Sequence, residues 1–140
     1  MSTVLWANAL INGKVISDES DKYALYKHSK KLDKVTKDLK LVNFEATHDF
    51  TDMKYNLSDD DLPEGMTSTD VVMAKEGVWI SGSEAVEMLE KMITHISERR
   101  PRFGLISNDY MEVIRELEES LELANRAKSE NGMFNFSVVM

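Results

Sequence analysis

The 140-residue chain contains no cysteine, and only two of its residues are proline. The absence of cysteine excludes disulfide bonds, thiolate zinc sites and a cysteine nucleophile. The sequence also has no apolar run near the roughly 20 residues that span a bilayer, and no basic segment precedes the apolar residues at its start. We therefore expect a soluble cytoplasmic protein with no membrane partner.

Several common functional motifs are also missing. The sequence has no internal repeat, no glycine-rich phosphate loop and no nucleophile elbow. Gly77 and Gly82 flank a short apolar run, but no third glycine completes a dinucleotide-binding motif. The nine methionines are better explained as adaptable packing residues than as a cofactor site. We expect no cofactor.

Charge is unevenly distributed along the chain. The net charge of −8 argues against general nucleic-acid binding, which requires cations that displace counterions from phosphates. Residues 1–40 carry eight lysines against five acidic residues, residues 41–82 two against nine, and residues 83–140 seven basic residues against eleven acidic ones. The simplest role of this charge is solubility. The excess of seven negative charges in the middle segment also suits a basic partner.

The N-terminal part predicts a hairpin followed by a helix. Residues 3–11 are apolar and favour a strand, and Asn12-Gly13 is a strong hairpin-turn signal. The returning strand is expected to be short, because residues 17–21 contain the capping residues and acids typical of a helix start. The helix is predicted over about residues 20–39, with a narrow apolar seam at Leu25, His28, Leu32, Val35 and Leu39.

The segment from residue 77 to residue 96 predicts a strand, a tight turn and an amphipathic helix. Val78, Trp79 and Ile80 form a β-prone run, and Ser81 and Glu84 have the spacing of a capping box. Apolar residues then recur at helical spacing up to Ile96. Pro101 is expected to stop this helix, and residues 103–106 are expected to enter the core.

A third helix is predicted over about residues 109–129. Its apolar side is formed by Tyr110, Val113, Ile114, Leu117, Leu121 and Ala124, and its solvent side by Glu112, Arg115, Glu116, Glu119, Glu122 and Arg126. Residues 133–140 alternate between apolar and polar side chains, which predicts a strand with one buried face. This strand is expected to join the sheet beside the N-terminal hairpin, or to pair with a second copy in a homodimer.

Together these patterns predict one α+β domain over residues 1–140. A small, mostly antiparallel sheet would combine the N-terminal hairpin, the Trp79 strand and the C-terminal strand, and about three helices would cover it chiefly on one face. The acidic, loop-rich segment around residues 45–76 lies between these elements. Its turn residues, such as Pro63 and Gly65, favour irregular structure.

The functional hypothesis that demands least of these residues is a non-enzymatic interaction or regulatory protein. It would present the acidic segment to the basic surface of a protein partner, and complementary charge would accelerate the encounter. The candidate binding residues are Asp59, Asp60, Asp61, Glu64 and Met66.

Two alternatives rest on smaller clusters. His48, Asp49 and Asp52 place an imidazole beside carboxylates, the ligand types used by metal-assisted hydrolases, although their spacing matches no established motif. Lysines and a tyrosine on the first helix could contact nucleic acid by ion pairing and stacking, namely Tyr26, Lys27, Lys30 and Lys34. For His28, within the apolar seam, a core histidine with a satisfied nitrogen is the simpler interpretation.

Overall fold

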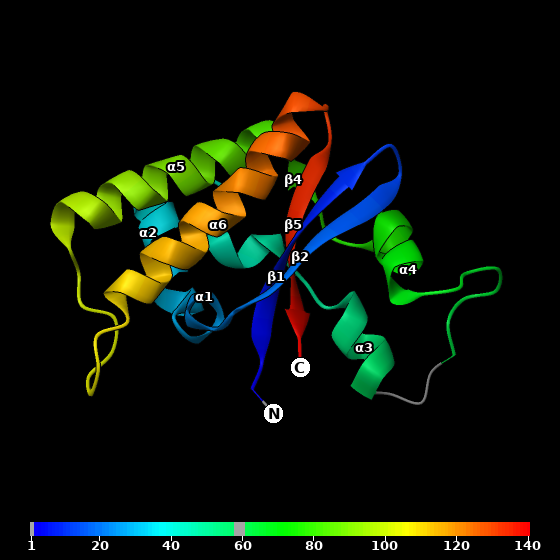
Figure 1. The fold of residues 1–140 in the computed structure, drawn as a ribbon, viewed down its shortest axis with the longest axis horizontal. Helices are drawn as coiled ribbons and strands as arrows, with labels where there is room; N and C mark the ends of the chain where they lie inside the picture. Colours follow the sequence, from blue (N-terminus) through cyan, green and yellow to red (C-terminus); the bar gives the residue numbers. More distant parts are fainter. Residues whose placement is uncertain (1, 58–60) are drawn as a thin grey trace.

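A computed structural model describes residues 2–57 and 61–140. These residues form an α+β fold with a five-stranded, mostly antiparallel sheet, which confirms the predicted fold class (Figure 1). Four strands follow the order β2-β1-β5-β3, and β4 pairs with β5. The one parallel pairing among the described strands joins β3 to β5.

The first two strands form the predicted hairpin. They are β1 (Val4–Ile11) and β2 (Lys14–Lys22), and the turn residues Asn12 and Gly13 both have positive φ, at 53° and 76°. This backbone matches the twist of paired strands and suits asparagine and glycine. The predicted short second arm is wrong, because residues 17 and 18 continue the pairing with β1. An edge strand tolerates polar residues, so its pairing with the apolar β1 overrides the local helix-start signal.

The predicted single helix over residues 20–39 is also wrong. The chain instead forms α1 (Tyr23–Lys27) and α2 (Ser29–Asp38), which are separated by His28 with φ −106° and ψ 22°. Nε2 of His28 lies 2.8 Å from Oδ2 of Asp109, so a tertiary contact holds the ring at the break. No glycine or proline marks this position in the sequence, which is why periodicity alone predicted a continuous helix.

The middle of the chain contains short elements. They are the 3-10 helix η1 (Phe44–Thr47), β3 (His48–Asp49), α3 (Thr51–Leu57) and α4 (Thr69–Glu76). The side chain of Ser68 caps α4 by accepting the N–H of Val71. The sequence did not predict α3, because its apolar residues are too few for a periodic pattern.

The second half carries the predicted strand–helix unit with a shorter strand. Strand β4 (Ile80–Ser81) leads into α5 (Gly82–Arg99), and the Ser81–Glu84 capping box is present in both directions. Trp79 lies before the strand rather than within it, half-buried, and its Nε1 donates to the carbonyl of Met73 at 2.8 Å. Pro101 follows the end of α5 as predicted.

The loop after α5 departs from prediction, and the last two elements follow it. Phe103 is fully buried, but Leu105 and Ile106 are exposed, so the expectation that residues 103–106 all enter the core is wrong. Helix α6 (Tyr110–Ser129) and strand β5 (Met133–Val139) then complete the described chain.

Strand β5 lies in the interior of the sheet. It pairs antiparallel with β1 from Val4 to Leu10 on one side, and with β3 and β4 at residues 133, 134, 136 and 137 on the other. The prediction that the C-terminal strand joins the sheet beside the hairpin is therefore confirmed. A homodimer through this strand would find both of its sides already paired along most of its length.

Helices lie on both sides of the sheet. In Figure 1, α5 and α6 run side by side along one face, with α1 and α2 beside them, whereas α3 and α4 lie on the other side. The sequence predicted three helices chiefly on one face. The main apolar core lies between the sheet and the α5–α6 pair, and includes Leu5, Ala7, Leu89, Met92, Leu117, Phe134 and Phe136. No described helix is long and apolar enough to cross a membrane.

Candidate functional site

Three carboxylates from separate elements gather on the α3–α4 side of the sheet. Asp52 belongs to α3, Asp70 to α4 and Glu19 to β2. Partial burial raises the pKa of the Asp70 carboxyl, and the negative charges of Asp52 and Glu19 raise it further. Like charges near one another favour the protonated form. The raised pKa of Asp70 therefore indicates that the fold brings these three carboxylates close together.

The carboxylate of Asp52 also joins α3 to α4. Its Oδ1 accepts a hydrogen bond from Oγ1 of Thr69 at 3.1 Å, and its Oδ2 accepts one from Nδ2 of Asn56 at 2.8 Å. Within residues 2–57 and 61–140, no ion pair involves Glu19, Asp52 or Asp70. The negative charge of this cluster is therefore not neutralised by the described part of the chain.

The candidate partner-binding residues follow the end of α3. Asp59 and Asp60 lie outside the described residues. Asp61 and Glu64 are exposed, and Met66 is half-buried. The N–H of Met66 donates to the carbonyl of Pro63 at 3.1 Å, and Gly65 has φ 84°. The turn predicted here is present, and it holds Glu64 in solvent.

The candidate metal ligands do not converge. His48 and Asp49 are adjacent in β3, so their side chains point to opposite faces of the sheet. Both carboxylate oxygens of Asp49 accept backbone N–H groups, from Thr51 at 2.9 Å and from Val78 at 2.8 Å. Among the described residues, no group of three or more His, Cys, Asp or Glu is placed to hold a metal ion. The carboxylate of Asp49 thus anchors the backbone around β3 and β4.

His48 is buried against the core. Its ring meets the ring of Phe44 edge-on, with centroids 5.1 Å apart, and its Nε2 has no hydrogen-bond partner among the described residues. Burial lowers the pKa of His48 to about 4, and the negative charge of Asp33 opposes this effect. The imidazole is therefore neutral near pH 7.

Three of the four candidate nucleic-acid contacts line one cavity. Its volume is about 470 Å³, and it is lined by Tyr26, Lys27, His28, Ser29, Lys30, Lys31, Glu45 and His48. Lys34 does not line it and instead pairs with Asp38 at 3.3 Å. Lys27 pairs with Asp109 at 3.0 Å, which neutralises part of the local charge. A short cationic patch remains, without a stacking platform of several aromatic rings.

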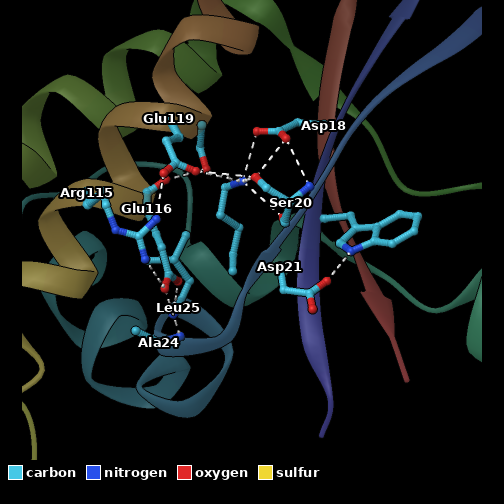
Figure 2. A network of polar contacts seen from close by, with 11 residues as sticks. Asp18, Ser20, Asp21, Ala24, Leu25, Arg115, Glu116 and Glu119 are labelled. Atoms are coloured by element: carbon cyan, nitrogen blue, oxygen red, sulfur yellow. Dashed lines mark hydrogen bonds and ion pairs between the residues drawn. The ribbon is translucent and has the colours of Figure 1, made fainter.

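A buried polar network that the sequence did not reveal joins β2, α1 and α6 (Figure 2). The side chain of Lys22 is fully buried, with its Nζ 2.9 Å from Oδ2 of Asp18 and 3.4 Å from Oε2 of Glu119. It also donates to the carbonyl of Ser20 at 3.1 Å. A buried lysine is rare unless it is paired. Because the partners of Lys22 lie on β2 and α6, this network holds the hairpin against the helix.

Glu116 is the second buried charge of this network. The sequence placed it on the solvent side of its helix, which is wrong: it is 3 % exposed. Its carboxylate accepts the N–H of Leu25 at 3.0 Å and that of Ala24 at 3.3 Å, at the start of α1. Burial raises the pKa of Glu116, and these hydrogen bonds oppose the increase. The only sequence signal was its position three residues after Val113, beside the apolar stripe.

Comparisons of the chain with protein-family models, with curated proteins and with solved structures found no significant match. Inference about function therefore rests on the geometry and charge of this chain.

Proposed function

We propose that this chain is a non-enzymatic binding protein whose acidic segment, residues 45–76, receives a basic surface of a protein partner. The observation that carries the proposal is the gathering of Glu19, Asp52 and Asp70 without a cation from the described part of the chain. The exposed Asp61 and Glu64 extend this charge along the segment that precedes α4.

Electrostatics gives the proposal its direction. The raised pKa of Asp70 means that its charged form is disfavoured beside Asp52 and Glu19. A lysine or arginine of a partner would relieve this repulsion, which the chain's own described cations do not. Complementary charges mainly increase the association rate, and salt weakens them over a Debye length of about 8 Å at physiological ionic strength.

The surface is also held in place rather than loose. Asp52 ties α3 to α4 through Thr69, and Ser68 caps α4. Helix α4 contacts β2, which carries Glu19. Because these elements are fixed relative to one another, the carboxylates present a defined pattern and little ordering is needed on binding.

The test is capture of partners from cell lysate on the immobilised protein at low and high salt. A double variant, Glu64→Gln with Asp70→Asn, removes two exposed acids that make no described hydrogen bond through their side chains. The matched control, Glu90→Gln with Glu98→Gln, removes two exposed acids of α5 and changes the net charge equally.

We expect a basic protein to be retained by the wild type and by the α5 control at low salt. High salt should release it, and the Glu64/Asp70 variant should retain it poorly. If no salt-sensitive partner is found, or if both variants retain the same partner equally, the acidic segment is not the binding surface.

A further inference from the structure

The loop between α5 and α6 displays two aliphatic side chains in solvent. Leu105 is 97 % exposed and Ile106 is 100 % exposed. Single exposed apolar residues are ordinary. Two adjacent aliphatic side chains that are almost fully exposed do not stabilise the fold of their own chain, so they indicate a contact surface. We refer to residues 99–106 as the tip.

The tip is attached to the core by its own hydrogen bonds. Phe103 is fully buried, and its carbonyl accepts the N–H of Asp109 at 2.8 Å. Oδ1 of Asn108 accepts the N–H of Phe103 at 2.9 Å and that of Tyr110 at 3.1 Å. These hydrogen bonds fix both ends of the loop. Leu105 is therefore exposed in an ordered loop rather than in a loose one.

Hydrogen bonds within the tip also fix the backbone of Gly104 and Leu105. Nε of Arg102 donates to the carbonyl of Gly104 at 2.7 Å, and its Nη2 donates to that of Leu105 at 3.2 Å. Gly104 has φ 114°, and a Cβ at this position would collide with the carbonyl of Ser107. Only glycine fits this backbone, so the chain turns sharply here and projects the next two side chains outward.

The tip also carries positive charge beside Leu105 and Ile106. Arg99, Arg100 and Arg102 are exposed, and none of them forms an ion pair within the part of the chain that the structure describes. Arg100 lies over the ring of Tyr110, 5.7 Å from its centroid. The tip thus combines aliphatic side chains with unpaired cations.

The outer side of α6 carries the complementary features. A groove of about 480 Å³ is lined by Met111, Glu112, Ile114, Arg115, Glu118, Glu119 and Glu122. Met111 is 70 % exposed and Ile114 is partly exposed, which gives the groove an apolar floor. Arg115 is already paired with Glu119 at 2.7 Å. Three glutamates of the lining have no ion pair among the described residues, namely Glu112, Glu118 and Glu122.

We propose that the tip of one copy of this chain inserts into the α6 groove of a second copy. Aliphatic side chains would cover the floor at Met111 and Ile114, and unpaired arginines would meet unpaired glutamates. If the two copies are related by a two-fold axis, each copy supplies one tip and one groove, so the contact is made twice. The contact uses neither strand β5 nor the acidic segment, so it is independent of the function proposed above.

The first experiment measures molar mass against concentration by light scattering and sedimentation. Two such contacts form a small interface, so we expect a weak dimer whose dissociation constant Kd can be measured by dilution. The double variant Leu105→Ser with Ile106→Ser should raise that Kd by at least about tenfold, because it removes two buried aliphatic side chains. Phe50→Ser, which removes another exposed apolar side chain from the far side of the sheet, is the control and should leave it unchanged.

A charge-reversal experiment tests the pairing itself. Arg99→Glu makes the tip less positive, because Arg100 and Arg102 remain, and Glu118→Arg makes the groove less acidic, so each variant alone should dimerise more weakly than the wild type. Mixing the two variants should restore association, because the carboxylate introduced in the tip of one copy then meets the guanidinium introduced in the groove of the other. The combined variant in one chain should also dimerise.

Three outcomes would overturn the proposal. One is a protein that stays monomeric at every concentration tested, and another is a dimer that the tip and groove variants do not weaken. The third is a monomer that binds vesicles containing phosphatidylserine through Leu105 and Ile106, which would assign the tip to an anionic membrane surface. A larger assembly that both sets of variants dissolve would support the contact in a head-to-tail arrangement.

Discussion

Asp18 and Lys22 form an ion pair across an irregularity in strand β2. Nζ of Lys22 lies 2.9 Å from Oδ2 of Asp18, although four residues of a regular strand span too great a distance for this contact. The register of β2 against β1 shifts at this point: Asp18 lies opposite Ala7, whereas Lys22 lies opposite Leu5. The extra residues form a bulge, which folds the strand so that the two charges meet.

Loss of this buried ammonium group should be costly. Lys22→Ala would leave an unfilled space and would remove the cation between Asp18 and Glu119. We expect the free energy of unfolding to fall by about 3 kcal/mol, measured by urea denaturation. Lys34→Ala, at an exposed pair with Asp38, should change it by less than about 0.5 kcal/mol. Equal losses in the two variants would show that the Lys22 network contributes little.

Glu116 should behave as an anchor for α1. Glu116→Ala leaves the N–H groups of Ala24 and Leu25 without their acceptor inside the protein. Hydrogen bonds to a charged acceptor contribute more than neutral ones, so we expect a loss of about 2–3 kcal/mol in unfolding free energy. Glu118→Ala, at an exposed position two residues later, is the control. Hydrogen exchange at Leu25 should also accelerate in the Glu116 variant, and unchanged protection there would contradict the anchoring role.

His48 should make stability depend on pH. Its pKa in the folded protein is lowered from 6.5 to about 4, so the unfolded chain binds a proton that the folded protein does not over this range. Its contribution is therefore present above pH 6.5 and is lost as the pH falls towards 4, by on the order of 3 kcal/mol in total. In His48→Phe, the free energy of unfolding measured by denaturation should differ less between pH 7 and pH 4.5 than in the wild type. If the variant keeps the pH dependence of the wild type, His48 is not the source of that dependence.

For Gly82→Ala, helix propensity predicts a gain in stability, whereas packing against α6 predicts a loss. It is the first residue of α5, and a Cβ there would lie 2.7 Å from backbone atoms of Ala127 and Lys128. Alanine is the better helix former, but overpacking against backbone should destabilise the protein by about 2 kcal/mol. Ser83→Ala, at the exposed next position, should have little effect on the thermal midpoint. Stabilisation by Gly82→Ala would show that α5 and α6 can separate at this crossing.

Features set by local interactions were predictable from the sequence. The Asn12-Gly13 turn, the capping box at Ser81 and Glu84, and the two long helices all depend on neighbours close in the chain. The alternation in the C-terminal segment correctly predicted a strand, but the expectation of a single buried face is wrong. Asn135 and Ser137, on the polar face, are also buried, because the side chain of Asn8 hydrogen-bonds to both of them.

Features set by distant neighbours were not predictable. Residues 17–21 have the composition of a helix start, but pairing with β1 makes them strand. Charged residues such as Lys22 and Glu116 are usually exposed, and only their partners in other elements explain their burial. The acidic segment was recognised from composition, whereas the approach of Glu19 to Asp70 required the fold.

The location of β5 constrains the order in which the molecule can assemble. This strand follows every other described element in the sequence, yet it fills the position between β1 and the short strands β3 and β4. During synthesis the hairpin and the helices emerge first, so β1 exposes an unpaired backbone edge until residues 133–139 have left the ribosome. The nascent chain therefore passes through an aggregation-prone stage, and its yield in cells should depend on chaperones that shield this edge.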